Sequence, residues 1–77
     1  MMSIKDIVFK RLKDYDIGEG FTLGTLVRAL EDNGRFCSDE TILRRLRELR
    51  SDDKRINYRA LGGCKFRLDW IDNGRLF

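Results

Sequence analysis

The chain has 77 residues, of which 42% are hydrophobic and 38% are charged, and its 16 Lys and Arg against 13 Asp and Glu give a formal net charge of +3. This length predicts one small domain over residues 1–77, with a core from about 3 to 70 and a C-terminal tail over 71–77. The longest uncharged, mainly apolar stretch is 21–27, far shorter than the ~20 residues of a membrane-spanning helix. The N-terminus also meets charged residues too early for a secretory signal. We therefore expect a cytoplasmic protein with no membrane partner.

The residue inventory excludes several kinds of catalysis. The sequence contains no histidine and only two cysteines, Cys37 and Cys64. A Ser-His-Asp or Cys-His arrangement therefore cannot be built, and two cysteines cannot complete the four-ligand set of a structural zinc site. The pair Gly62 and Gly63 precedes no helix that could form a phosphate-binding loop. We predict that the protein is not an enzyme and uses no metal or cofactor.

A first helix is predicted from Ser3, a good N-cap with Asp6 in position for a capping box, to about Tyr15. Its apolar residues recur at the spacing of one buried helical stripe: Ile4, Ile7, Val8, Leu12 and Tyr15. The glycines of 17–20 end this helix. Residues 21–22 can lie extended before a second helix, which Thr22 caps and which ends at 33–34. The apolar stripe of that second helix is Leu23, Leu26, Val27 and Leu30.

Ser38 is predicted to cap a third helix, whose first turn carries the acidic residues that the helix dipole favours, and 51–54 ends it. Its buried face consists of Ile42, Leu43, Leu46 and Leu49. At about 100° per residue, Arg45 lies on one flank of the exposed face. The exposed face itself holds Glu40, Thr41, Arg44, Arg47 and Glu48.

From Arg55 onward the apolar period becomes alternating, which predicts a β-hairpin. A three-residue loop over 61–63 segregates apolar from charged side chains by pairing Ala60 with Cys64 and Tyr58 with Phe66. The residues then predicted to point inward are Ile56, Tyr58, Ala60, Cys64, Phe66, Leu68 and Trp70, and those pointing outward include Arg59, Lys65 and Arg67. One core is expected to contain Ile7, Leu12, Leu26, Leu30, Ile42, Leu46, Tyr58, Phe66 and Leu68. The aromatic residues Phe21, Tyr58, Phe66 and Trp70 are expected in that core, with a stacking platform for single-stranded nucleic acid as the alternative.

Positive charge is concentrated in one part of the chain. Residues 44–67 carry nine Lys and Arg against three Asp and Glu, a net of +6, whereas residues 1–43 carry a net of −2. Within this basic segment Arg outnumbers Lys by seven to two. The planar guanidinium fits phosphate groups and guanine edges. Because the exposed faces of the third helix and of the hairpin are both basic, the sequence indicates contact with nucleic acid.

The order helix, short extended piece, helix, tight link, Arg-rich helix and hairpin resembles the winged helix-turn-helix DNA-binding domains of bacterial, archaeal and phage regulators. The resemblance covers about residues 3–70 and is carried mainly by SDETILRRLRELR at 38–50 and INYR at 56–59. It implies an α+β fold of three helices followed by a two-stranded wing. The tail 71–77 and the lack of a second basic wing depart from the family pattern.

In that family the third helix lies in the major groove and the wing on the DNA backbone. The resemblance and the helical wheel together predict base contacts from Thr41, Arg44 and Arg47. The predicted phosphate contacts are Ser38, Arg45, Arg59, Lys65 and Arg67.

We therefore expect a small protein that binds double-stranded DNA sequence-specifically, as a transcriptional regulator or a phage or plasmid accessory protein. A homodimer or a protein partner is compatible with this role. One alternative is a winged-helix adaptor for protein–protein contacts, working through the acidic first half or through Ile71, Leu76 and Phe77. Another is a binder of RNA or single strands. Glu40 and Glu48 are the main objection to DNA binding, since carboxylates on the exposed helix face repel phosphates.

Overall fold

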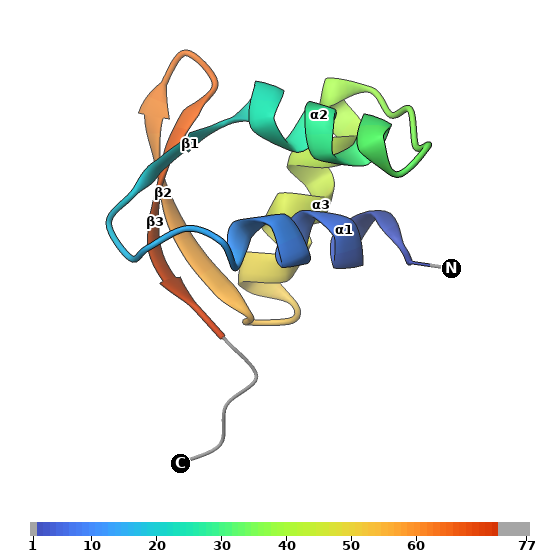
Figure 1. Ribbon diagram of the computed structural model, residues 1–77. Helices are drawn as coiled ribbons and strands as arrows, with labels where there is room; N and C mark the ends of the chain where they lie inside the picture. Colours follow the sequence, from blue (N-terminus) through green and yellow to red (C-terminus); the bar gives the residue numbers. More distant parts are fainter. Residues whose placement is uncertain (1, 73–77) are drawn as a thin grey trace.

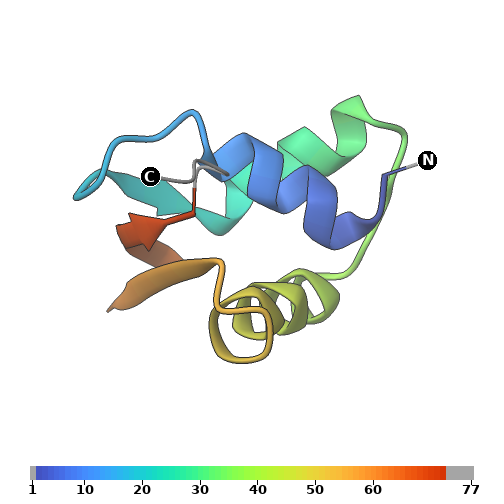
Figure 2. The same ribbon diagram turned by 90° about the horizontal axis from the view of Figure 1, so that it is seen from below.

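In the computed structural model, which describes residues 2–72, three helices cover one face of a three-stranded antiparallel sheet (Figures 1 and 2). The elements are α1 (Ile4–Leu12), β1 (Gly20–Thr22), α2 (Leu23–Asp32), α3 (Asp39–Ser51), β2 (Ile56–Gly62) and β3 (Lys65–Ile71). The predicted α+β class is confirmed, but the expected two-stranded sheet is wrong because β1 adds a third strand. No helix in residues 2–72 has both the length and the apolar character needed to cross a membrane.

The helices begin at the caps that the sequence predicts. The Ser3 hydroxyl accepts from the Asp6 N–H at 3.1 Å and the Asp6 carboxylate accepts from the Ser3 N–H at 3.2 Å, which completes the capping box of α1. Thr22 and Ser38 cap α2 and α3 in the same way, each accepting from the N–H three residues later. α1 ends at Leu12 rather than near Tyr15, because its last turn tightens and the Tyr15 N–H donates to the Leu12 carbonyl.

The third strand, β1, lies beside β3, which is the central strand in the order β1-β3-β2. Phe21 pairs with Phe66, their rings stack at a centroid distance of 5.3 Å, and Phe21 is buried. The β1 strand therefore joins the stretch before α2 to the hairpin through an aromatic contact in the core.

The hairpin of β2 and β3 has a tighter turn than expected. Its loop is the pair Gly63 and Cys64, both with positive φ, and Ala60 pairs with Phe66 instead of Cys64. The predicted three-residue loop and its register are wrong: the different turn and a bulge between Ala60 and Gly62 together displace the pairing by two residues. A displacement of two keeps Tyr58, Phe66 and Leu68 buried and Arg59 and Arg67 exposed, as predicted. Cys64 instead lies in the exposed turn, and Ala60 is also exposed.

A second irregularity changes the end of β3. Tyr58 pairs with Leu68, but Asn57 pairs with Trp70, so Asp69 is an extra residue on β3. Beyond this bulge the alternation is inverted. Trp70 turns outward and is 49% exposed, whereas Ile71 packs against the core. The expected core position of Trp70 is therefore wrong.

One continuous core joins all the elements. The nine predicted core residues, Ile7, Leu12, Leu26, Leu30, Ile42, Leu46, Tyr58, Phe66 and Leu68, are confirmed as members of a single buried cluster. The cluster also includes Phe9 and Ala29. Four residues of the predicted helical stripes, Ile4, Tyr15, Val27 and Leu43, are only half-buried at its margin. This core holds α3 and the hairpin together, and so sets the relative position of the two basic faces.

Candidate nucleic-acid interface

The outer face of α3 presents two arginines that form no ion pair within residues 2–72, although Glu40 is also exposed on this helix. Ile42, Leu46 and Leu49 are buried against the rest of the domain, so Arg44 on the opposite side of the helix points into solvent. Arg47 is likewise exposed. Within residues 2–72, neither guanidinium makes an ion pair or a side-chain hydrogen bond, so all their donors are available to a ligand.

The hydroxyl groups of Ser38 and Thr41 lie at the N-terminus of this face. Ser38 Oγ accepts from the Thr41 N–H at 3.2 Å, and the two hydroxyl oxygens are 3.0 Å apart in a second hydrogen bond. Ser38 is exposed and Thr41 half-buried. The cap therefore already engages both hydroxyls, although each retains capacity for another partner.

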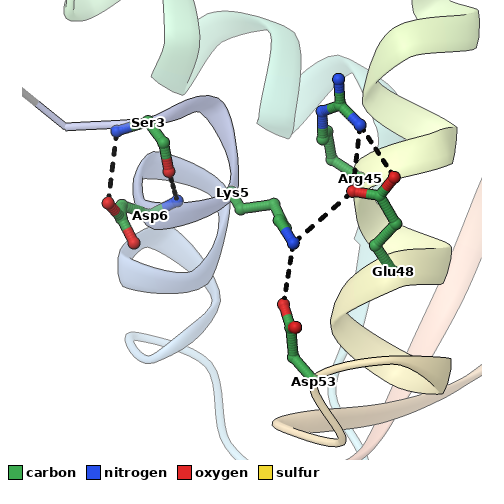
Figure 3. A network of polar contacts seen from close by, with 6 residues as sticks. All are labelled: Ser3, Lys5, Asp6, Arg45, Glu48 and Asp53. Carbon is green, nitrogen blue, oxygen red and sulfur yellow. Dashed lines mark hydrogen bonds and ion pairs between the residues drawn. The ribbon is translucent and has the colours of Figure 1, made fainter.

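Arg45 differs from its neighbour Arg44 because it lies on the flank of α3 that faces α1. Its Nη1 donates to both carboxylate oxygens of Glu48, at 2.9 and 3.0 Å (Figure 3). Lys5 of α1 approaches the same carboxylate at 3.6 Å and donates to Asp53 at 3.0 Å. The hydrogen bond to Asp53 is the main reason that the pKa of Lys5 is raised. Glu48, expected on the exposed face, is thus half-buried between two cations.

The outward face of the hairpin carries the second basic group. Arg59 and Arg67 pair across β2 and β3 and are both exposed, and Lys65 is exposed near the turn. These three predicted outward positions are confirmed. Asp69 lies 3.7 Å from the Nε atoms of both arginines, so it offsets part of their charge. The face keeps an excess of positive charge.

The two basic faces meet at β2 but point in different directions. α3 packs beside β2 on the inner side of the sheet (Figure 2). Arg59 and Arg67 are exposed, on the opposite face from the buried Tyr58, Phe66 and Leu68. Arg50 lies at the junction, where its guanidinium is 4.4 Å from the Tyr58 ring centroid and donates to the Tyr58 carbonyl at 3.5 Å. Burial raises the pKa of Tyr58, and the nearby Arg50 and Arg47 act against that increase.

Two aromatic side chains are exposed although the sequence analysis did not predict their exposure. Trp70 lies on the outer sheet face beyond the bulge, and Phe36, in the link between α2 and α3, is 80% exposed. Strict alternation hides the bulge that turns Trp70 outward. The residues Leu76 and Phe77, named for an apolar tail surface, lie outside the described residues.

A groove of about 660 Å³ separates α1 from α2. Its charged lining is mixed, with Lys10, Arg11 and Arg28 beside Asp14 and Asp32. The groove therefore favours no single class of charged ligand. The exposed faces of α3 and the hairpin, which are mainly basic, indicate an anionic ligand more clearly. No protein-family model, curated protein or solved structure matches this chain.

Proposed function

We propose that this protein is a small sequence-specific DNA-binding protein of the winged helix-turn-helix type, acting as a transcriptional regulator or a phage or plasmid accessory protein. The observation that carries the proposal is the pair Arg44 and Arg47, which is exposed on α3 and forms no ion pair among residues 2–72. The arrangement of three helices and a three-stranded sheet is compatible with a winged helix.

In the proposed complex α3 enters the major groove, whose width of about 12 Å admits a helix. Arg44 is at the middle of the exposed face and donates to O6 and N7 of a guanine, and Thr41 and Arg47 contact neighbouring bases. Ser38 at the helix N-terminus contacts a phosphate. Arg59, Lys65 and Arg67 contact phosphates from the hairpin, and the release of counterions from the DNA supplies most of the sequence-independent affinity.

The proposal is tested with a duplex site selected from random sequences and with a mixed-sequence duplex, using dissociation constants measured over a range of salt. Replacing Arg44 by Ala should cost roughly 1–3 kcal/mol on the selected site and much less on mixed DNA. Stability should change by less than about 0.5 kcal/mol, because the side chain is exposed. Arg28→Ala, an exposed arginine on α2, is the matched control and should leave selectivity unchanged.

Each outcome of this experiment bears on a separate part of the proposal. Lack of binding to either duplex at low salt contradicts DNA binding altogether. Equal losses on both duplexes for Arg44→Ala would reassign Arg44 to a phosphate. Arg59→Ala should weaken both complexes alike and lower the salt slope by about one, and a change in the preferred sequence would show that the hairpin reads bases.

A protein-interaction adaptor is the second candidate, and the exposed ring of Phe36 favours it. A phenylalanine that is 80% exposed, in the link between α2 and α3, is a suitable anchor for a partner protein. This function predicts no DNA selectivity in the binding experiment. Under it, Phe36→Ala should abolish partner binding without loss of stability.

A further inference from the structure

An ion-pair network holds Arg45 in place on the flank of α3. Among Arg44, Arg45 and Arg47, only Arg45 has an acidic partner within residues 2–72. Arg45 and Glu48 form a two-oxygen contact, and Lys5 reaches Glu48 from α1 (Figure 3). The side chains of Arg45 and Glu48 are only 31% and 27% exposed. Asp53, in the turn after α3, holds Lys5 at 3.0 Å. Glu48 is therefore positioned from two sides, by its own helix and by α1.

We propose that Glu48 is a specificity-determining residue that holds Arg45 away from the DNA backbone. This inference rests on the proposed function. Every cation that reaches a phosphate strengthens binding to all sequences alike and steepens the salt dependence by about 0.9 per contact. By engaging Arg45, Glu48 limits sequence-independent binding and leaves Arg44 and Arg47 as the free arginines of α3.

The geometry explains why this pair persists beside DNA. Ionic screening weakens contacts between exposed charges most, whereas a partly buried pair is screened less. Two N–H···O contacts from one guanidinium to one carboxylate are charge-assisted and short. A phosphate approaching Arg45 must also approach the Glu48 carboxylate, which repels it. Lys5 keeps that carboxylate beside Arg45, so Lys5 is a positioning residue in this arrangement.

A purely structural role for the network would have different consequences. It would make Glu48 a link between α1 and α3, so its loss would lower stability and leave the salt dependence of DNA binding unchanged. The decisive measurement is therefore the slope of log affinity against log salt on mixed-sequence duplex DNA, together with the ratio of affinities for selected and mixed duplexes.

In Glu48→Gln the amide cannot neutralise Arg45, so the salt slope should steepen by about 0.9 and the specificity ratio should fall. Asp53→Asn is the matched control, because it removes one negative charge from the same network and leaves Arg45 bound to Glu48. It should leave the slope at the wild-type value. An equal change in both variants would show a general charge effect and would overturn the inference.

Arg45→Ala tests the inference while it keeps the Glu48 carboxylate and its contact with Lys5, and so remains decisive if a thermal melt followed by circular dichroism shows that Glu48→Gln does not fold. In the otherwise wild-type chain it should leave the slope unchanged, and combined with Glu48→Gln it should restore the wild-type slope. A slope reduced by about 0.9 in Arg45→Ala alone would make Arg45 a phosphate contact and overturn the inference. Failure of the wild-type protein to bind DNA would instead contradict the proposed function, and the inference with it.

Discussion

Three arginines of α3 have different chemical roles because of where the helix rotation places them. Arg44 faces solvent without an ion pair in residues 2–72, Arg45 binds Glu48, and Arg50 lies over the Tyr58 ring. The neighbouring side chains therefore decide which arginine can donate to DNA.

Leu46 lies on the buried face of α3 that fixes the orientation of the helix. It is fully buried, so Leu46→Ala should lower the free energy of unfolding by roughly 2–5 kcal/mol, a large part of the stability of so small a domain. Leu43→Ala, on the same helix but half-buried, should cost less. Urea denaturation measures both changes. A melting temperature that barely moves in Leu46→Ala would contradict the described helix phase.

Tyr58 should make the stability depend on pH in alkaline solution. Because burial raises the pKa of its phenol in the folded protein, the unfolded chain loses that proton at a lower pH, near its ordinary value of about 10. The contribution of the protonated Tyr58 phenol to stability is complete below about pH 10 and is lost as the pH rises through the pKa of Tyr58 in the folded protein. The pKa of Lys5 is also raised, so its titration likewise lowers the stability of the folded protein as the pH rises.

Comparison with Tyr58→Phe isolates the phenol, because Lys5 is present in both proteins. Denaturation midpoints measured from pH 8 upward should fall less steeply in the variant than in the wild type. Identical slopes in the two proteins would contradict the assigned effect of burial on Tyr58.

At the scale of elements, the hairpin turn places a non-glycine residue in a conformation that favours glycine. Gly63 and Cys64 have φ of 59° and 62°, the sign pattern of the tight hairpin turn that glycine and asparagine prefer. The Cys64 side chain is exposed. Its Cβ therefore causes strain without any gain from burial.

Replacing Cys64 by Gly should raise the free energy of unfolding by about 0.5–1 kcal/mol. The relief of backbone strain stabilises the folded protein, and the greater conformational freedom of glycine in the unfolded chain cancels part of that gain. Gly63→Ala, the matched change at the other turn residue, should destabilise the protein, although open space surrounds its Cα. Thermal denaturation under reducing conditions measures both. A lower stability of Cys64→Gly would contradict the inferred backbone strain at Cys64.

At the scale of the whole molecule, the aromatic contacts predict a single cooperative transition. Phe21 of β1 contacts the rings of Tyr15, Tyr58 and Phe66, so it joins the turn after α1 to both hairpin strands. All helices and strands contribute to one buried cluster. No element can therefore unfold without exposing core surface on the others.

The fluorescence of Trp70, the single tryptophan, reports on the sheet, and far-UV circular dichroism reports mainly on the helices. The two signals should have coincident midpoints in urea. An earlier midpoint for Trp70 would show that the hairpin unfolds separately.

Local chemistry allowed the sequence alone to determine much of this protein. Caps such as Ser3 and Ser38 act over three residues, and helical periodicity marked buried residues such as Leu46, so both can be recognised without knowledge of the fold. The alternation of the hairpin also determined that Arg59, Lys65 and Arg67 face outward. It could do so despite the wrong loop, because a shift of two residues preserves the faces of a strand.

Only the tertiary structure decided the features that need a distant partner. The β1 strand is too short to show alternation and exists because Phe21 meets Phe66. The outward turn of Trp70 comes from a bulge, which depends on how β3 pairs with β2. The pairing of Arg45 with Glu48 lies within one helix, but its support by Lys5 requires α1 to pack against α3, and no periodicity encodes which charges such packing brings together.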